Sequence, residues 1–165
     1  MKNALSGFRR RAGVAACLVA IAAAIAFTSL ARSQNAPPSS AEQAIKYRQS
    51  VYKVILWNFG PMAAVAQGKA PYDAEEFARH AERVAQMAPM LLEGYPEGSA
   101  TGATTRAKPE IWSNVPEFRQ LMTAMEGKAA ALAAVAKGGD EEKAKAAFVE
   151  LGGACKACHT KFRSD

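Results

Sequence analysis

The chain has 165 residues, of which 50% are hydrophobic and 22% are charged, with 21 basic and 15 acidic residues for a formal charge of +6. This length allows one globular domain rather than several. Four of the 21 basic residues lie before residue 12, which leaves 17 basic against 15 acidic residues, a formal +2, for the rest of the chain. The charge therefore gives no reason to expect a nucleic-acid partner.

The start of the chain has the pattern of a secretory signal peptide. A basic segment precedes an apolar run over residues 12–27. Small residues at and before Ala31 predict cleavage after that residue, and residues 24–26 offer a second site. The apolar run is shorter than the about 20 residues of a membrane span, which favours cleavage over a retained anchor. We expect residues 1–31 to be removed, residues 32–165 to form one domain, and the protein to be periplasmic.

Two helices are predicted in the first half of the domain. A helical pattern begins near Ala41 and ends at Ala66. Its inward-facing residues recur at alternating spacings of three and four, which is typical of a helix in a bundle: Ile45, Arg48, Tyr52, Ile55, Phe59, Met62 and Ala66. Pro61 should kink or locally break this helix, because proline lacks an N–H and clashes with the preceding turn. Asp73 is predicted to cap a second helix, whose apolar stripe extends to Leu91.

A long connection and two further helices follow. Residues 94–113 are rich in Gly, Thr and Pro, and a connection of this length is often functional. A third helix is predicted from the boundary at residues 113–115, with Pro116 in its first turn, and a fourth from the N-cap Asp140. No segment alternates with a period of two. The predicted fold is all-α, an antiparallel four-helix bundle.

The end of the chain carries the strongest chemical signal, the motif Cys155-Lys156-Ala157-Cys158-His159. Cys-x-x-Cys-His is the attachment signature of a c-type haem. On a helix, Cys155, Cys158 and His159 share one face, so two thiols can form thioethers while the imidazole ligates the iron. Neither Met nor His follows His159. A second axial ligand must therefore come from earlier in the chain, or the sixth position is open. The connection at residues 94–113 can lie over an edge of this cofactor.

Two other readings of this motif are less well supported. A redox disulfide would be expected within a βαβ pattern, whereas the surroundings here are Ala-rich and helical. A zinc site needs two more ligands, but the only other cysteine is Cys17, in the signal segment, and the only other histidine is His80. We expect His80 to be a structural or surface residue rather than a ligand, and Met122 and Met125 to fill the core.

Two polar residues occupy positions of the first helix where a bundle ordinarily places Leu or Ile. Arg48 and Tyr52 lie one turn apart on the same face. One reading is that Arg48 extends to solvent and Tyr52 buries its ring with its hydroxyl at the rim. With a haem in the bundle, Arg48 is suited to pair with a propionate, and Tyr52 can lie over the haem plane.

Taken together, these segments resemble cytochrome c′, of the class II c-type cytochromes. The resemblance covers essentially the whole chain after the signal segment and rests on five stretches in this order: Ala44–Ser50, Phe59-Gly60 with Met62, Gly68–Ala74, Pro109–Ser113, and the Cys155–His159 motif with Phe162-Arg163. The resemblance implies a four-helix bundle with one covalently attached haem c near the C-terminus. It also implies a homodimer formed through the first two helices, although Pro61 is unexpected there.

The resemblance assigns a role to each of six residues. Cys155 and Cys158 hold the haem, and His159 is the proximal ligand. The remaining three surround the cofactor: Arg48 binds a propionate, Tyr52 blocks the sixth position without binding it, and Arg163 lies beside the proximal histidine. Low-spin relatives such as cytochrome c-556 place a ligating Met in the region of Tyr52.

The leading functional hypothesis is a five-coordinate haem protein that binds diatomic gases, nitric oxide and carbon monoxide among them. The alternatives are a low-spin electron-transfer cytochrome of the c-556 type, or a plain electron shuttle whose gas binding is incidental. A peroxidase-like enzyme is disfavoured, because no distal His or carboxylate–Arg set is evident. Redox partner proteins are not indicated by the sequence.

Overall fold

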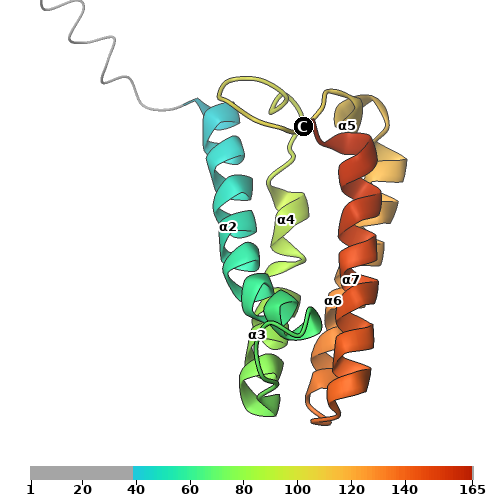
Figure 1. Cartoon of the computed structure of the whole chain (residues 1–165). Helices are drawn as coiled ribbons and strands as arrows, with labels where there is room; N and C mark the ends of the chain where they lie inside the picture. Colours follow the sequence, from blue (N-terminus) through green and yellow to red (C-terminus); the bar gives the residue numbers. More distant parts are fainter. Residues whose placement is uncertain (1–38, 165) are drawn as a thin grey trace, which may run out of the picture. The chain divides into compact units, whose positions relative to one another are not determined.

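The computed structural model describes residues 39–164, so the predicted signal segment 1–31 lies outside the described residues. Four of its helices are long and correspond to the four that the sequence predicts, whereas α4 and α5 are single turns (Figure 1). In chain order the helices are α2 (Ser40–Ala66), α3 (Ala74–Met87), α4 (Met90–Glu93), α5 (Glu110–Ser113), α6 (Val115–Ala136) and α7 (Glu141–Phe162). Within residues 39–164 the only β pairing is an isolated antiparallel bridge between Ala107 and Arg163. The all-α prediction is confirmed.

Polar side chains fix the starts of three long helices. The Ser39 hydroxyl accepts from the Glu42 N–H at 3.1 Å before α2, and the Asp73 carboxylate accepts from the Glu76 N–H at 2.8 Å before α3. Asp140 caps α7 in the same way. Each bond satisfies one of the backbone donors that a helix leaves without an intrahelical partner. Asn114 makes no such bond, and α6 begins within the predicted boundary, with proline in its first turn.

The two prolines of the first helical pair act differently. α2 remains helical through Pro61, so the predicted local break does not occur, although the last turns of the ribbon bend away from the line of the first ones (Figure 1). Pro89 does interrupt its helix: α3 ends at Met87, and Leu91 belongs to α4 rather than to α3. Pro89 cannot donate to the carbonyl four residues earlier, and here the chain turns instead of bending.

The helices pack as an antiparallel bundle. α6 and α7 are joined by a tight turn at Gly138-Gly139 and lie against each other along their length, while α3 packs on both α2 and α6. α2 and α7 meet at far fewer positions. One of these is the ring pair Phe59–Phe148, whose centroids lie 4.4 Å apart. α2 and α7 are thus in direct contact through these two rings.

The core contains apolar side chains from every helix. Met122 and Met125 are buried in it, as predicted for core residues. At the outside of α2, by contrast, Val54, Leu56 and Trp57 are exposed. None of the helices within residues 39–164 combines the length and apolar character that a membrane crossing requires.

Candidate functional site

The last turns of α7 bring the three motif residues together. Cys158 is buried, while Cys155 and His159 are half-buried, and both thiols are free. Burial raises the pKa of the Cys155 thiol, and it raises that of Cys158 to about 11. Both sulfurs therefore belong to the inner face of the helix, as the one-face prediction requires.

The long connection holds the end of α7 in place through a short antiparallel pairing. The Lys108 N–H donates to the Phe162 carbonyl at 2.9 Å, and the Ser164 N–H donates to the Arg106 carbonyl at 2.8 Å. The Arg106 side chain adds a third bond, from Nε to the Ser164 carbonyl at 2.9 Å. The predicted position of the connection over the cofactor end of the bundle agrees with these contacts. Arg163, between the paired residues, is thereby fixed at the last turn of α7.

A positive charge faces the ring of His159. Arg163 Nη1 lies 3.3 Å from His159 Nδ1. Burial lowers the pKa of His159, and the charges of Arg163 and Arg106 lower it further. A metal-ligating histidine usually donates its second N–H to a carboxylate or carbonyl, which makes it a stronger ligand. Here the neighbour of Nδ1 is a guanidinium, which has no acceptor for that N–H.

Arg48 does not extend to solvent: the residue is only 2% exposed. Its guanidinium donates to the Gly94 carbonyl at 2.9 Å, to the Ser99 hydroxyl at 3.1 Å and to the Ser99 carbonyl at 3.0 Å. A longer bond of 3.3 Å reaches the Thr105 hydroxyl. The long connection therefore wraps around this side chain, and the alternative of a solvent-directed Arg48 is wrong.

The acceptors of Arg48 are all neutral. The guanidinium also lies over the Tyr95 ring at 4.7 Å and over the Trp112 ring at 5.6 Å. Among residues 39–164 no carboxylate forms an ion pair with it. A buried cation is costly unless an anion is paired with it. A carboxylate-bearing cofactor such as haem fits this position, because guanidinium–carboxylate bonds are strong and directional.

Tyr52, on α2, packs against the core cluster that includes Cys158 of α7. Its hydroxyl lies 3.4 Å from that of Tyr95. The pKa of Tyr52 is raised above its ordinary value, chiefly by burial, next by Tyr95, and then by the thiols of Cys158 and Cys155. The residue is half-buried, which agrees with the buried ring considered from the sequence, and its hydroxyl contacts Tyr95.

The sequence did not single out Tyr95, Ser99 or Thr105, although they contact Tyr52 or Arg48. They lie in the connection over residues 94–113, whose length marked it as a candidate functional segment. The location of the missing partners could therefore be predicted, but not their identities.

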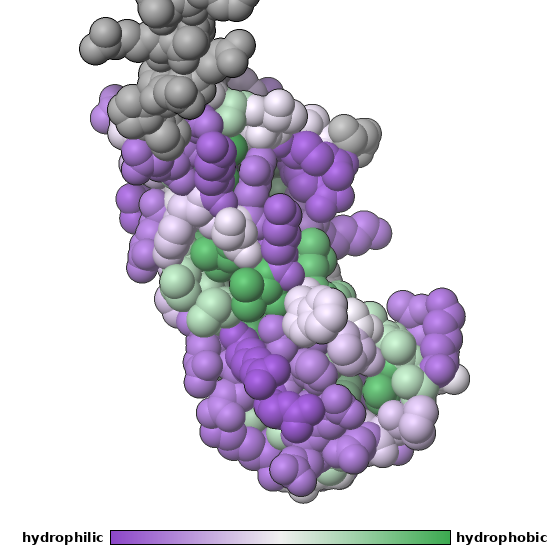
Figure 2. All heavy atoms as spheres, turned by 90° about the vertical axis from the view of Figure 1, so that its left-hand side faces the viewer, coloured by the Kyte–Doolittle hydropathy of each residue, from purple (hydrophilic) through white to green (hydrophobic). Residues whose placement is uncertain are grey.

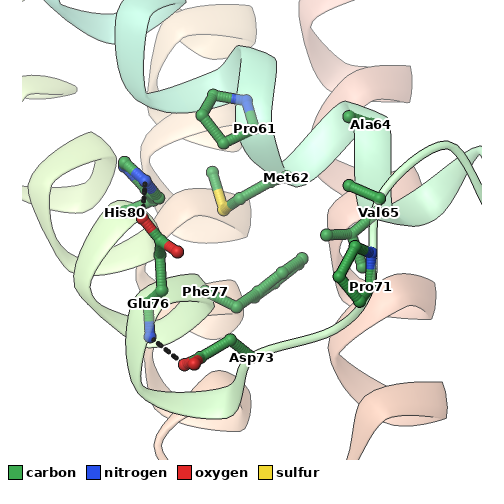
Figure 3. A pocket seen from close by; sticks show the side chains of 10 residues that line it. Pro61, Met62, Ala64, Val65, Pro71, Asp73, Glu76, Phe77 and His80 are labelled. Atoms are coloured by element: carbon green, nitrogen blue, oxygen red, sulfur yellow. Dashed lines mark hydrogen bonds and ion pairs between the residues drawn. The ribbon is translucent and has the colours of Figure 1, made fainter.

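His80 lies away from this site, at the other end of α2. The residue is buried, with Nδ1 3.0 Å from the Asn58 side-chain oxygen and Nε2 3.6 Å from Glu76. Figure 3 shows His80 and Glu76 beside a cleft that also includes Pro61 and Met62. The contacts agree with the structural role expected for His80.

Comparison with known proteins connects this geometry to a family. A family model described as Cytochrome C' matches residues 43–163. Cytochrome c' of Rubrivivax gelatinosus is 41% identical over 120 residues, covering 73% of this chain and 93% of that protein. The solved structure of cytochrome c prime from Shewanella frigidimarina has a TM-score of 0.74 at 38% identity, covering 77% of this chain and 98% of that one.

A solved nitric oxide complex is also similar to this chain. It contains a variant of cytochrome c prime from Alcaligenes xylosoxidans and has a TM-score of 0.71 at 35% identity. The match covers 77% of this chain and 98% of that one. Sequence and structure comparisons thus agree over the helical domain.

Proposed function

Since the chain belongs to the cytochrome c′ family, we propose that it is a periplasmic haem protein whose five-coordinate iron binds small diatomic gases. Members of this family carry one covalently attached haem c, and Cys155 and Cys158 are available for it. When bound, the haem supplies an iron that can take up nitric oxide or carbon monoxide. The nitric oxide complex of the Alcaligenes relative supports this choice of ligand class.

Each residue of the proposed site has a role that follows from its position. Cys155 and Cys158 attach the cofactor to the inner face of α7, and His159 is the only protein ligand to the iron. Arg48 holds a propionate with its buried guanidinium. Arg163 keeps a positive charge beside His159 Nδ1, which limits the donor strength of the imidazole.

The observation that carries the proposal is the identity and position of Tyr52. A phenol, rather than a methionine thioether, packs from α2 against the core cluster that contains Cys158. Met62, the methionine of α2, is ten residues further along, or roughly 15 Å on a helix, and lies in the core beside the cleft of Figure 3. Tyr52 therefore crowds the distal side without supplying the sulfur ligand of a low-spin relative.

Electron transfer remains the alternative role. An iron that changes oxidation state can serve as a shuttle whether or not it binds gas, and neither role requires enzymatic turnover. We expect gas binding to be the principal role, because electron transfer alone does not require a bulky side chain over the sixth position of the iron. Tyr52 would select ligands that bond iron strongly enough to displace a ring, and nitric oxide does so better than dioxygen.

We also propose a homodimer formed through α2 and α3. Trp57 is 78% exposed and Leu56 is 64% exposed on α2. Figure 2, which turns the α2 side toward the viewer, shows apolar residues gathered between hydrophilic ones on this face. Exposed apolar patches of this kind commonly mark protein interfaces.

The test is an absorption spectrum of the haem-loaded protein with and without nitric oxide and carbon monoxide. We expect a high-spin ferrous spectrum without a sharp low-spin α band, and a clear change on adding either gas. A methionine-to-iron charge-transfer band in the ferric protein would instead identify a six-coordinate electron-transfer cytochrome.

Kinetics then test Tyr52 directly. Tyr52→Ala should accelerate carbon monoxide association with the ferrous protein by about tenfold or more, the equivalent of about 1.4 kcal/mol of barrier, because the whole ring is removed. Tyr52→Phe should keep most of the block, since the ring is what occludes the site. Unchanged kinetics in the Ala variant would place the gate elsewhere, in the Met122/Met125 face of α6 or in the long connection.

A further inference from the structure

We propose that Tyr95 is a positioning residue for the distal gate, because it holds Tyr52 in the orientation that crowds the gas-binding side. This inference rests on the proposed function and names a residue that acts through Tyr52 rather than on the ligand. It is carried by three sets of contacts around Tyr95: with the Tyr52 hydroxyl, with the Arg48 guanidinium, and with the rings of α5 and α6.

The first contact joins the two phenols. The hydroxyl oxygens of Tyr52 and Tyr95 lie 3.4 Å apart. Among residues 39–164, this is the only hydrogen bond of the Tyr52 side chain. The distance exceeds the usual range of about 2.5–3.0 Å for O–H···O bonds, so the bond is weak. It orients the ring without locking it, and its removal should widen the motion of Tyr52 rather than unfold the bundle.

The second and third contacts make Tyr95 a firm support. Its ring lies 4.8 Å from that of Phe118 and 6.1 Å from that of Trp112, centroid to centroid, which are favourable aromatic separations. On another side the Arg48 guanidinium lies 4.7 Å from the ring. Burial raises the pKa of Tyr95 above its ordinary value. Tyr95 is therefore held by three helices and by the cation proposed to bind the propionate.

This arrangement links the two proposed cofactor contacts of α2. Arg48 and Tyr52 are on one helix, and each touches Tyr95, which enters from the connection that follows α4. A shift of Arg48 would move Tyr95 and so change the freedom of Tyr52. Tyr95 thus couples the seating of the cofactor to the crowding of its distal side.

The experiment measures carbon monoxide association with the ferrous, haem-loaded protein for Tyr95→Phe, Tyr52→Phe and the double variant. Tyr95→Phe keeps the ring and its packing and removes only the hydroxyl. We expect about a twofold acceleration for each single variant, as the loss of one weak hydrogen bond implies, and no further acceleration in the double variant. Ultraviolet resonance Raman, which reports phenol hydrogen bonding, should show a change at Tyr52 when Tyr95 becomes Phe.

Tyr47→Phe is the matched control. Tyr47 is also on α2, and its hydroxyl donates to Glu93, two residues before Tyr95, at 2.7 Å. Losing this exposed hydroxyl should leave the association rate unchanged. Equal acceleration by Tyr47→Phe would overturn the inference, because the effect would not be specific to the Tyr52 contact.

Three further outcomes distinguish a failure of the inference from a failure of the proposed function. If Tyr52→Ala is fast while Tyr95→Phe matches the wild type, the gate stands and the role of Tyr95 is refuted. If Tyr95→Phe accelerates association equally in the Tyr52→Phe background, Tyr95 does not act through the Tyr52 hydroxyl, and the inference is again wrong. If Tyr52→Ala itself changes nothing, the proposed gate fails and the inference fails with it.

Discussion

The contact between Gly94 and Arg48 predicts a strong effect for the smallest possible substitution, Gly94→Ala. A Cβ at Gly94 would lie 2.5 Å from Arg48 Cβ, 3.1 Å from its Cα and 3.3 Å from its backbone nitrogen. The φ of Gly94 is −76°, which alanine adopts freely, so the obstacle is steric and not conformational.

The atoms that the new methyl group would meet are not the end of a flexible side chain. They belong to the backbone and Cβ of a helical residue, so α2 and the end of α4 must move apart. Overpacking of this kind costs about 1–3 kcal/mol. The same movement would shift the Gly94 carbonyl, which accepts from Arg48, and the adjacent Tyr95. We therefore expect lower stability together with faster carbon monoxide association.

The assay is guanidinium unfolding of the ferric haem-loaded protein at fixed pH, followed by far-ultraviolet circular dichroism. Gly127→Ala in α6 is the control, because a Cβ there meets nothing within 4 Å. It should stabilise the helix by up to about 1 kcal/mol, since alanine is the better helix former. If Gly94→Ala were as stable as Gly127→Ala, the approach of α2 to Gly94 would be looser than the structure describes, and the reasoning would be refuted.

Three other predictions follow from features of the bundle. Replacing both Cys155 and Cys158 by Ser should prevent haem attachment and leave an expanded chain. α2 and α7 have few contacts with each other, so without haem the core between them would be poorly packed. Sharp, native-like side-chain NMR dispersion in the haem-free variant would contradict this. Hydrogen bonding to the Lys143 side chain and backbone lowers the pKa of Asp140, so its stabilisation is complete above the ordinary carboxyl pKa of about 4 and is lost as pH falls through the lower folded value. Asp140→Asn should therefore flatten the acid side of a plot of melting temperature against pH, and an unchanged plot would exclude this contribution. Trp57→Lys should convert the proposed dimer into monomers in sedimentation velocity, whereas Val149→Lys, at another exposed apolar residue, should not; a dimer that persists in Trp57→Lys would place the interface elsewhere.

Local rules accounted for the helices and for the haem motif. Asp73 and Asp140 could be identified as caps because an N-cap bond joins residues only three apart. The motif residues share a face for the same local reason. The opposite behaviours of Pro61 and Pro89 could not be predicted, because missing N–H groups permit either a bend or a break and the packing around each proline decides between them.

The surroundings of Arg48 and Tyr52 were accessible only in part. Their unusual positions in the helical pattern marked them as candidates, and the long connection marked the segment that could meet them. Their partners Tyr95 and Ser99 lie 43 and 51 residues further along the chain. Such separations are fixed by tertiary packing, which no local spacing encodes.

The burial of the motif cysteines has a consequence for the order of assembly. Cys158 is buried in the bundle, and Tyr52 of α2 packs against the same core cluster. A rigid macrocycle larger than any side chain cannot enter between packed helices without separating them. We therefore expect thioether formation to precede the closure of α2 over α7. In the last stage of folding, the helices would then pack around a haem that is already attached, and the haem would not enter a bundle that has already folded.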